Sequence, residues 1–161
     1  MTQKNLKGIV LAGGKGSRLS PLTSVISKQL LPVYDKPMIY YPISTLMLMG
    51  VKDILLITTK RDQALFENLI GKGDNFGIII TCEVQEEPKG IPEAFILAEK
   101  FIGNSKVVLI LGDNIFYGHD LTTQLISAST KNFDATIFAY RVQDPTRFGI
   151  INFNKDDMPT H

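Results

Sequence analysis

Apolar runs alternate with longer amphipathic segments along this chain of 161 residues. Four runs have the length and composition of strands; they cover Lys7–Ala12, Asp53–Thr58, Ile78–Val84 and Lys106–Leu111. Continuous runs of Val, Ile and Leu indicate strands that are buried on both faces, as in a parallel sheet. A fifth strand is predicted at Ala135–Tyr140, and a short one at Ile150–Phe153.

The segments between the strands have apolar residues at helical spacing. This pattern predicts helices at Pro37–Met49, Asp62–Ile70, Pro92–Phe101 and Asp120–Lys131. Pro42 predicts a kink or a late start in the first of them, because proline cannot donate the helical hydrogen bond, and Asp35 is a candidate cap. Strands that alternate with helices predict an α/β fold, with a Rossmann-like, mostly parallel sheet and helices on both faces.

A glycine-rich turn follows the first predicted strand. Gly13, Gly14 and Gly16 leave backbone N–H groups open to an anion, while Lys15 and Arg18 add positive charge. Because ligands of parallel sheets bind at the carboxyl ends of the strands, the turn lies where a phosphate is expected.

Two better-known phosphate motifs do not fit this turn. A P-loop requires Gly-Lys-Ser or Gly-Lys-Thr, whereas the order here is Gly-Lys-Gly-Ser over residues 14–17. The dinucleotide fingerprint Gly-x-Gly-x-x-Gly fails at Leu19. A simple turn between a strand and a helix is the alternative, but three glycines and Arg18 at the edge of a parallel sheet favour an anion site.

Polar residues also follow the other predicted strands. Asp113 comes directly after the strongest one, where a carboxylate can hold Mg²⁺ together with substrate phosphates, or can simply begin a turn. Its expected position at the same edge as the glycine turn favours the metal. Three further polar residues have an open role: Lys28, Gln29 and Gln85. A lysine here can simply be solvated, and a Gln amide can either pair with a base edge or lie on a solvated surface.

Composition excludes several classes of protein. Hydrophobic residues make up 44% and charged residues 20%, which is a globular balance, and the net charge of +1 lacks the basic excess of a nucleic-acid binder. Cys82 is the only cysteine and only two histidines are present, which argues against a disulfide or a Cys/His-rich metal module. The longest aliphatic run, Val107–Leu111, is too short to span a bilayer, and the polar N-terminus has no signal core, so we expect a cytoplasmic protein.

Longer motifs resemble the sugar-nucleotide pyrophosphorylases. Leu11–Leu19, followed by Pro21–Thr23, is similar to the signature of that family. Ser27–Pro42 and Leu111–Asp120 resemble the glucose-1-phosphate thymidylyltransferases within it, and the resemblance extends over nearly the whole chain from Lys7. It implies Mg²⁺-dependent transfer from dTTP to α-D-glucose 1-phosphate, giving dTDP-glucose and pyrophosphate by in-line displacement without a covalent intermediate.

The resemblance also implies residue roles. Arg18 and Lys28 are the implied catalytic residues at the phosphates, and Asp113 is the implied Mg²⁺ ligand. Gln85 is implied to read the thymine edge. The other implied contacts are Leu11, Gly13, Gly14, Gly16, Gln29, Gly90 and Leu111 with the nucleotide, and Gly149 with the sugar.

Three departures from the family pattern are visible. The family commonly has Gly-Leu-Ala-Gln-Ala where Gly90–Ala94 reads Gly-Ile-Pro-Glu-Ala, and Tyr-Gly where this chain has Phe148 and Gly149. Proline and glutamate both suit the first turn of a helix. The family's Glu-Lys-Pro motif and second metal carboxylate have no counterpart before His161. We therefore expect residues 1–161 to be the nucleotide-binding portion of a single α/β domain, truncated before its sugar-binding remainder and inactive alone.

The resemblance extends to partners. It implies a homotetramer for the full-length protein and inhibition by a dTDP-sugar end product, with neither nucleic acid nor membrane as a partner. One alternative is a nucleotide- or sugar-nucleotide-binding module without turnover, for which the end of the chain at His161 is the support. A nicotinamide oxidoreductase is a further alternative, against which Leu19 argues because it interrupts the fingerprint.

Overall fold

The computed structural model describes residues 6–14, 16–87, 89–131, 135–155 and 158–160. The chain divides into two compact units, Met1–Ser129 and Thr130–His161, and each is described by itself.

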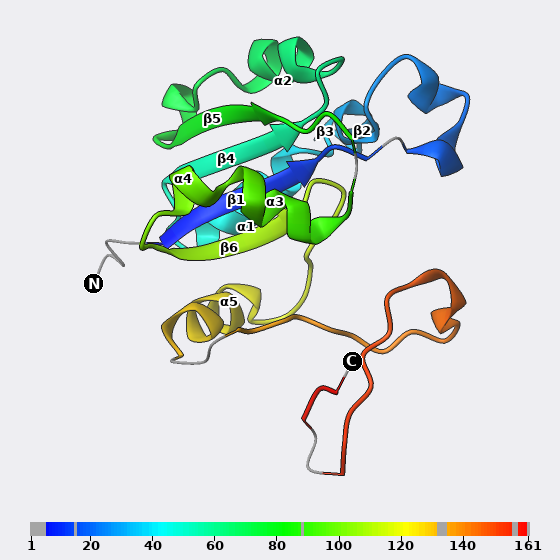
Figure 1. The fold of residues 1–161 in the computed structure, drawn as a ribbon, viewed down its shortest axis with the longest axis vertical. Coiled ribbons are helices and arrows are strands. Elements are labelled where there is room, and N and C mark those ends of the chain that lie inside the picture. Colours follow the sequence, from blue (N-terminus) through cyan, green and yellow to red (C-terminus); the bar gives the residue numbers. More distant parts are fainter. Residues whose placement is uncertain (1–5, 15, 88, 132–134, 156–157, 161) are drawn as a thin grey trace. The chain divides into compact units, whose positions relative to one another are not determined.

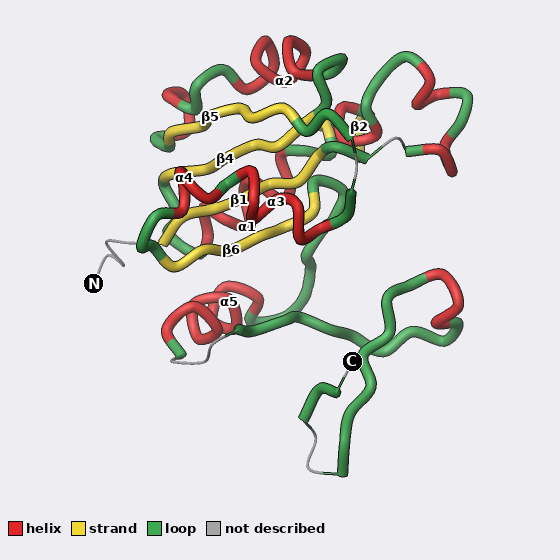
Figure 2. Tube along the Cα trace, in the orientation of Figure 1, coloured by secondary structure: helices red, strands yellow, loops and turns green. Residues whose placement is uncertain are grey.

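A four-stranded sheet forms the centre of the first unit (Figures 1 and 2). Its strands lie in the order β5-β4-β1-β6, and all three pairings are parallel. The strands are β1 (Leu6–Ala12), β4 (Asp53–Thr58), β5 (Ile79–Val84) and β6 (Lys106–Leu111). A small antiparallel hairpin is formed by β2 (Pro32–Val33) and β3 (Lys36–Pro37). The four strands predicted for this unit are therefore confirmed, and so is their parallel arrangement.

Five α-helices accompany the strands in the described residues; they are α1 (Tyr40–Leu48), α2 (Gln63–Ile70), α3 (Ile91–Leu97), α4 (Glu99–Ile102) and α5 (Leu121–Thr130). The late start predicted from Pro42 is confirmed, because this proline lies in the first turn of α1, where its missing N–H needs no helical partner. The segment expected as one helix from Pro92 is divided at Ala98 into α3 and α4.

The predicted cap at Asp35 is wrong. The N-cap of α1 is Ile39, which makes no side-chain cap bond. Asp35 lies between β2 and β3 instead and pairs with Lys36, whose hydrogen bond lowers the pKa of the carboxyl. Only Met38 and Ile39 lie between β3 and α1, so the helix follows directly from the β2–β3 hairpin. The sequence pattern did not predict this hairpin.

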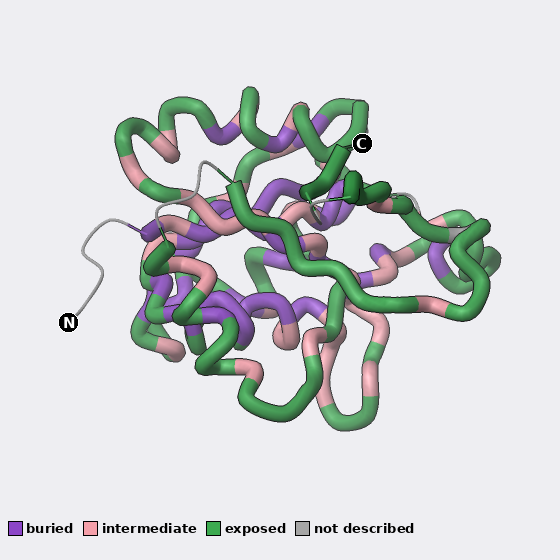
Figure 3. The backbone as a smooth tube through the Cα atoms, turned by 90° about the horizontal axis from the view of Figure 1, so that it is seen from below, coloured by how far each residue is buried: buried purple, intermediate pink, exposed green. Residues whose placement is uncertain are grey.

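Two apolar clusters cover the opposite faces of the sheet, because successive side chains of a strand point to opposite sides. Val10 and Leu56 contribute to the cluster that contains α1, α2 and α5. Ile9 and Leu55 contribute to the other, together with Ala94 of α3. Figure 1 shows α3 and α4 in front of the sheet with α1 behind it, and Figure 3 marks the buried segments. The expectation of helices on both faces is confirmed.

Cys82 lies on β5 with its side chain half-buried beside the first cluster. Burial raises the pKa of the thiol to about 11, and the negative charge of Glu67 adds to the effect. The thiolate, which is the nucleophilic form, is therefore scarce near neutral pH. Cys82 packs against the core, and its raised pKa argues against a role as a nucleophile.

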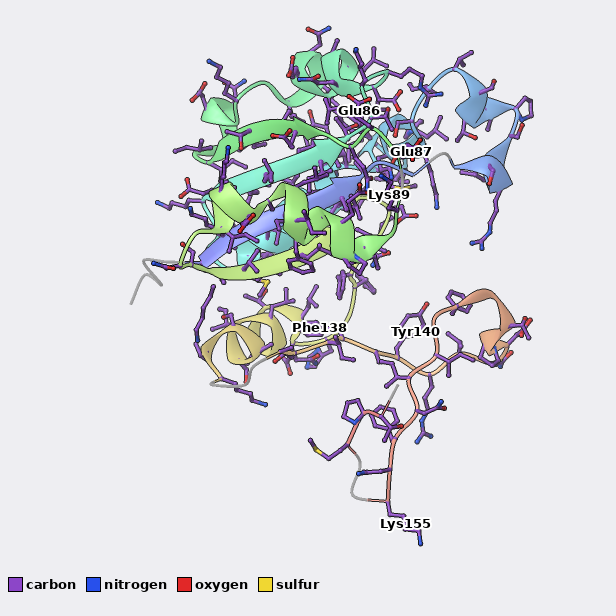
Figure 4. The ribbon with its side chains drawn as sticks, viewed as in Figure 1. Glu86, Glu87, Lys89, Phe138, Tyr140 and Lys155 are labelled. Atoms are coloured by element: carbon purple, nitrogen blue, oxygen red, sulfur yellow. The ribbon has the colours of Figure 1, made fainter. Side chains whose placement is uncertain are left out.

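The second unit does not contain the strands that the sequence predicted. Ala135–Tyr140 has no strand assignment, and its residues Phe138 and Tyr140, labelled in Figure 4, are exposed. Instead of a strand at Ile150–Phe153, Phe153 forms an isolated antiparallel bridge with Pro159. Backbone hydrogen bonds of 2.9 Å, from Thr160 to Asn152 and from Asn154 to Met158, flank this bridge. An apolar run becomes a strand only as part of a longer ladder, and no strand is assigned within the described part of this unit. Among the described helices, none is long and apolar enough to cross a membrane.

Candidate functional site

A cavity of about 260 Å³ opens at the carboxyl edge of the sheet. Its lining residues are Gly14, Gly16, Ser17, Arg18, Leu19, Lys28, Gln29 and Asp113. All of these except Ser17 and Leu19 were predicted as site residues from the sequence. The structure therefore brings the glycine turn, both cationic side chains and the carboxylate together in one cavity.

The strand order explains why these segments meet. β1 lies directly beside β6, with Leu11 opposite Leu111, and the N–H of Gly112 donates a hydrogen bond of 2.8 Å to the carbonyl of Leu11. The glycine turn follows β1 and Asp113 follows β6. Because adjacent parallel strands end at the same edge, the two motifs lie side by side although they are far apart in the sequence.

Lys28 and Asp113 form an ion pair inside the cavity lining. The Nζ atom of Lys28 donates to Oδ2 of Asp113 at 3.0 Å, and the two side chains are 31% and 34% exposed. A partly exposed pair of this kind contributes only about 0–1 kcal/mol to stability. The pair can therefore open for a ligand at small cost, and it presents one positive and one negative group at the same place.

Gln29 is buried beside this pair. Its Oε1 atom accepts a hydrogen bond from the hydroxyl of Ser27, which is also buried. An added Cβ on Gly112 would lie 3.0 Å from Cγ of Gln29, which means that glycine at this position lets Gln29 approach the end of β6. Ser27, two residues before Gln29, was not singled out from the sequence, because its residue type and spacing carry no signal of this contact.

The backbone of the glycine turn is held in a left-handed conformation at Gly16. Gly16 has φ of 61°, and an added Cβ would lie 2.9 Å from Cγ2 of Thr23. The hydroxyl of Thr23 in turn donates to the carbonyl of Gly16 at 2.8 Å. A residue with a side chain would be strained here by both its backbone and its neighbour.

We expect Gly16→Ala to lower the free energy of unfolding by about 1–2 kcal/mol, because alanine is disfavoured at this φ and its Cβ crowds Thr23. Urea unfolding followed by circular dichroism measures the change. Gly14→Ala is the matched control, since nothing lies within 4 Å of a Cβ at Gly14. Equal destabilisation by the two variants would contradict the strained turn.

Gln85 lies against the glycine turn at Gly13, and neither of these two predicted site residues belongs to the cavity lining. Its backbone N–H donates to the carbonyl of Thr58 at 2.8 Å, and its side chain is buried. The Oε1 atom fills the space that a Cβ on Gly13 would need, while Nε2 donates to Oε2 of Glu93. Glycine at position 13 therefore allows the Gln85 amide to lie directly against the turn.

The nucleotidyl transferase family matches residues 7–160 of the chain. This chain belongs to the nucleotidyl transferase family. The parallel sheet, with a glycine turn and an acidic residue at the ends of adjacent strands, is consistent with that assignment.

Curated relatives show which members of this family are similar to the chain in sequence. The chain is 57% identical over 151 residues to a glucose-1-phosphate thymidylyltransferase of Neisseria gonorrhoeae, covering 94% of this chain and 52% of that protein. It is 52% identical over 155 residues to a protein of the same name from Xanthomonas campestris pv. campestris, covering 96% and 52%. The chain thus spans about half the length of the curated relatives it matches.

Solved structures share the fold. A crystal structure described as a glucose-1-phosphate thymidylyltransferase from Bacillus anthracis, in complex with a sucrose, is similar with a TM-score of 0.86 and 41% identity, covering 93% of this chain and 61% of that one. A UDP-glucose pyrophosphorylase complexed with UDP-glucose is more distant, with a TM-score of 0.64 and 26% identity, covering 78% and 54%. The α/β nucleotidyltransferase fold predicted from the sequence is therefore confirmed.

Other predicted site residues of this nucleotidyl transferase lie outside the cavity lining. Leu11 and Leu111 are half-buried neighbours in the sheet, and Gly90 is the N-cap of α3 with φ of 96°. Gly149 is an exposed residue of the second unit. Lys15 lies outside the described residues. The roles that the resemblance implies for these residues stay predictions.

The chemistry open to this nucleotidyl transferase follows from the residues in the cavity. Backbone N–H groups of the turn and the guanidinium of Arg18 can bind phosphate oxygens. Among the described side chains, none forms an ion pair with Arg18, so its guanidinium is available to a ligand. Arg61 differs, because it is paired with Asp62, and this pairing raises the pKa of Arg61. Within the described part of the chain, three or more His, Cys, Asp or Glu residues nowhere come together as a metal cluster. Asp113 is the carboxylate in the cavity lining.

Proposed function

We propose that this chain is the nucleotide-binding portion of a glucose-1-phosphate thymidylyltransferase, which transfers a thymidylyl group from dTTP to α-D-glucose 1-phosphate and releases pyrophosphate. The observation that carries the proposal is the cavity in which Arg18, Lys28 and Asp113 meet the glycine turn. The names of the relatives that are 52–57% identical supply the substrates.

The reaction is a displacement at phosphorus that needs anion binding and charge stabilisation. A phosphate oxygen of the sugar phosphate attacks the α-phosphorus of dTTP, and the bond to the bridging oxygen of the leaving pyrophosphate breaks in line with it. In the proposed mechanism the turn and Arg18 hold the triphosphate, and Lys28 stabilises the charge that develops at the reacting centre; their common position in the cavity lining supports these roles. The nucleophile is already an anion, so no general base is required.

Asp113 is the residue that would hold Mg²⁺. Its carboxylate lies in the cavity and is one-third exposed, and the ion pair with Lys28 involves Oδ2. A single carboxylate suits this ion, which commonly completes its shell with substrate phosphates and water. When bound, Mg²⁺ supplies neutralisation of the phosphate charge.

We further propose that Gln85 reads the thymine edge. Gln29 and Gly90 shape the nucleotide pocket, and Leu11 and Leu111 line its floor. Gly149 contacts the sugar. The protein acts in the cytoplasm as a homo-oligomer, a homotetramer at full length, with a dTDP-sugar as inhibitor.

The test combines binding and turnover. Calorimetric titration of this chain with dTTP, with and without Mg²⁺, is expected to show binding that Mg²⁺ strengthens. Pyrophosphate release on adding glucose 1-phosphate is expected from this chain once the other half of a relative is supplied in trans or by fusion. No dTTP binding by the chain would refute the proposal. Binding without release in any of these forms would instead favour a nucleotide-binding module.

A further inference from the structure

The side-chain amide of Gln85 has a different neighbour at each end. Its Oε1 atom lies against Gly13, and its Nε2 atom donates to Oε2 of Glu93. The same Glu93 oxygen accepts the backbone N–H of Lys89 at 3.0 Å. The carboxylate thus joins the loop after β5 to the first turn of α3 and reaches the buried amide from there.

The partner at position 93 decides which way this amide faces. An ionised carboxylate only accepts hydrogen bonds, so it can bind the Nε2 end of Gln85 and not the Oε1 end. A flipped amide would leave two acceptors facing each other in a mostly buried place, which costs about 1–3 kcal/mol. The amide therefore has one favoured orientation, with its acceptor at the Gly13 end.

We propose that Glu93 is a positioning residue, which fixes the Gln85 amide so that it accepts a pyrimidine N3–H donor and disfavours a pyrimidine with an acceptor at N3. This inference rests on the proposed function, in which Gln85 contacts the base. Thymine and uracil carry an N3–H donor next to the O4 acceptor. Cytosine carries the reverse, an N3 acceptor next to an amino donor, so a Gln amide free to flip could pair with either edge.

A fixed Gln85 amide affects the choice between thymine and cytosine but not the choice between thymine and uracil. An amide fixed by Glu93 selects thymine and uracil against cytosine. It does not separate thymine from uracil, because these bases differ only by a methyl group away from the paired edge. A purely local role for Glu93 is the competing explanation, since its bond to the Lys89 N–H also stabilises the start of α3. That role would change stability but not the preference between bases.

The experiment compares dTTP, UTP and dCTP binding by calorimetry in this chain and three variants. Glu93→Leu removes the acceptor, and the affinity ratio of dTTP to dCTP is expected to fall about tenfold, while the ratio of dTTP to UTP stays unchanged. Glu93→Gln keeps an acceptor that the Lys89 N–H orients, so it is expected to retain most of the selectivity. Glu87→Leu removes the same charge from an exposed position of the same loop (Figure 4), and is expected to behave as wild type.

The outcomes distinguish this inference from the proposed function. If wild type prefers dTTP to dCTP and Glu93→Leu keeps that preference, the inference is wrong and the proposed function stands. A wild-type chain that binds no nucleotide overturns both. A second measurement does not depend on the folding of Glu93→Leu: in NMR spectra of wild type, one Gln85 amide proton is expected to exchange slowly with water and to shift in Glu93→Gln. Rapid exchange and an unchanged shift would overturn the fixed orientation.

Discussion

Asp113→Ala is expected to abolish the Mg²⁺ dependence of dTTP binding by this chain, and to lower turnover by at least about 10²–10³-fold in a longer protein that carries it. The reason is that Asp113 is the one carboxylate among the described residues that line the cavity, and the neutral oxygens of Ser17 and Gln29 cannot replace its charge as a ligand of the ion. Titration of Mg²⁺ at fixed dTTP measures the first effect, and pyrophosphate release measures the second.

The variant should remain folded, because the partly exposed pair with Lys28 contributes only about 0–1 kcal/mol. Asp74→Ala is a suitable control, since Asp74 is an exposed carboxylate of the same unit and does not line the cavity. Asp113→Asn keeps the shape of the side chain and removes the charge, so it should lose most of the Mg²⁺ effect as well. Full Mg²⁺ dependence in Asp113→Ala would refute the metal assignment.

Arg18→Ala is expected to weaken dTTP binding about 10- to 100-fold, as the loss of about 1.5–3 kcal/mol in hydrogen bonds to charged oxygens predicts. The guanidinium lines the cavity and is exposed, so it can reach phosphate oxygens without first breaking an internal pair. Calorimetry at low and high salt measures the effect, which should shrink as ionic strength rises.

Two comparisons isolate the role of the guanidinium. Arg18→Lys keeps the charge but loses the planar fork, so an intermediate loss is expected. Lys100→Ala removes a positive charge from α4, which leads toward the start of β6 and thus lies at the opposite edge of the sheet, and it should leave dTTP affinity unchanged. The phosphate role of Arg18 fails if its alanine variant binds dTTP as tightly as the Lys100 control does.

Local pattern was sufficient for the strands of the sheet. The run at Lys106–Leu111 and the one at Asp53–Thr58 were predicted with the boundaries that the structure shows. β4 lies inside the sheet and is buried along nearly its whole length, so almost every position had to be apolar. β6 is an edge strand and only partly buried, but its side chains pack against the clusters on both faces, so its pattern was strong as well. At Ala135–Tyr140 the same kind of pattern gave a wrong strand, because composition is local whereas a strand requires a partner.

The same distinction holds for the candidate site. The glycines, Arg18 and Asp113 could be found from residue type and from their position after predicted strands, and the family resemblance added Lys28 and Gln85. For Glu93, residue type and spacing indicate only that it suits the start of a helix. Its bond to Gln85 depends on how α3 returns across the sheet face, which no local spacing encodes.

The sequence by itself determined the fold class, the four strands of the sheet and the residues able to bind phosphate and a hard cation. It predicted burial of every strand on both faces, whereas the edge strands β5 and β6 are only partly buried. Only the tertiary structure decided which strands are neighbours: the order β5-β4-β1-β6 brings Asp113 next to the glycine turn and to Lys28. The physical reason is that hydrophobic periodicity reports the burial of each element, while strand order is fixed by hydrogen bonds and helix packing between segments distant in the chain. The residues that can bind phosphate and a cation could therefore be identified from the sequence, whereas their meeting in one cavity depends on the fold.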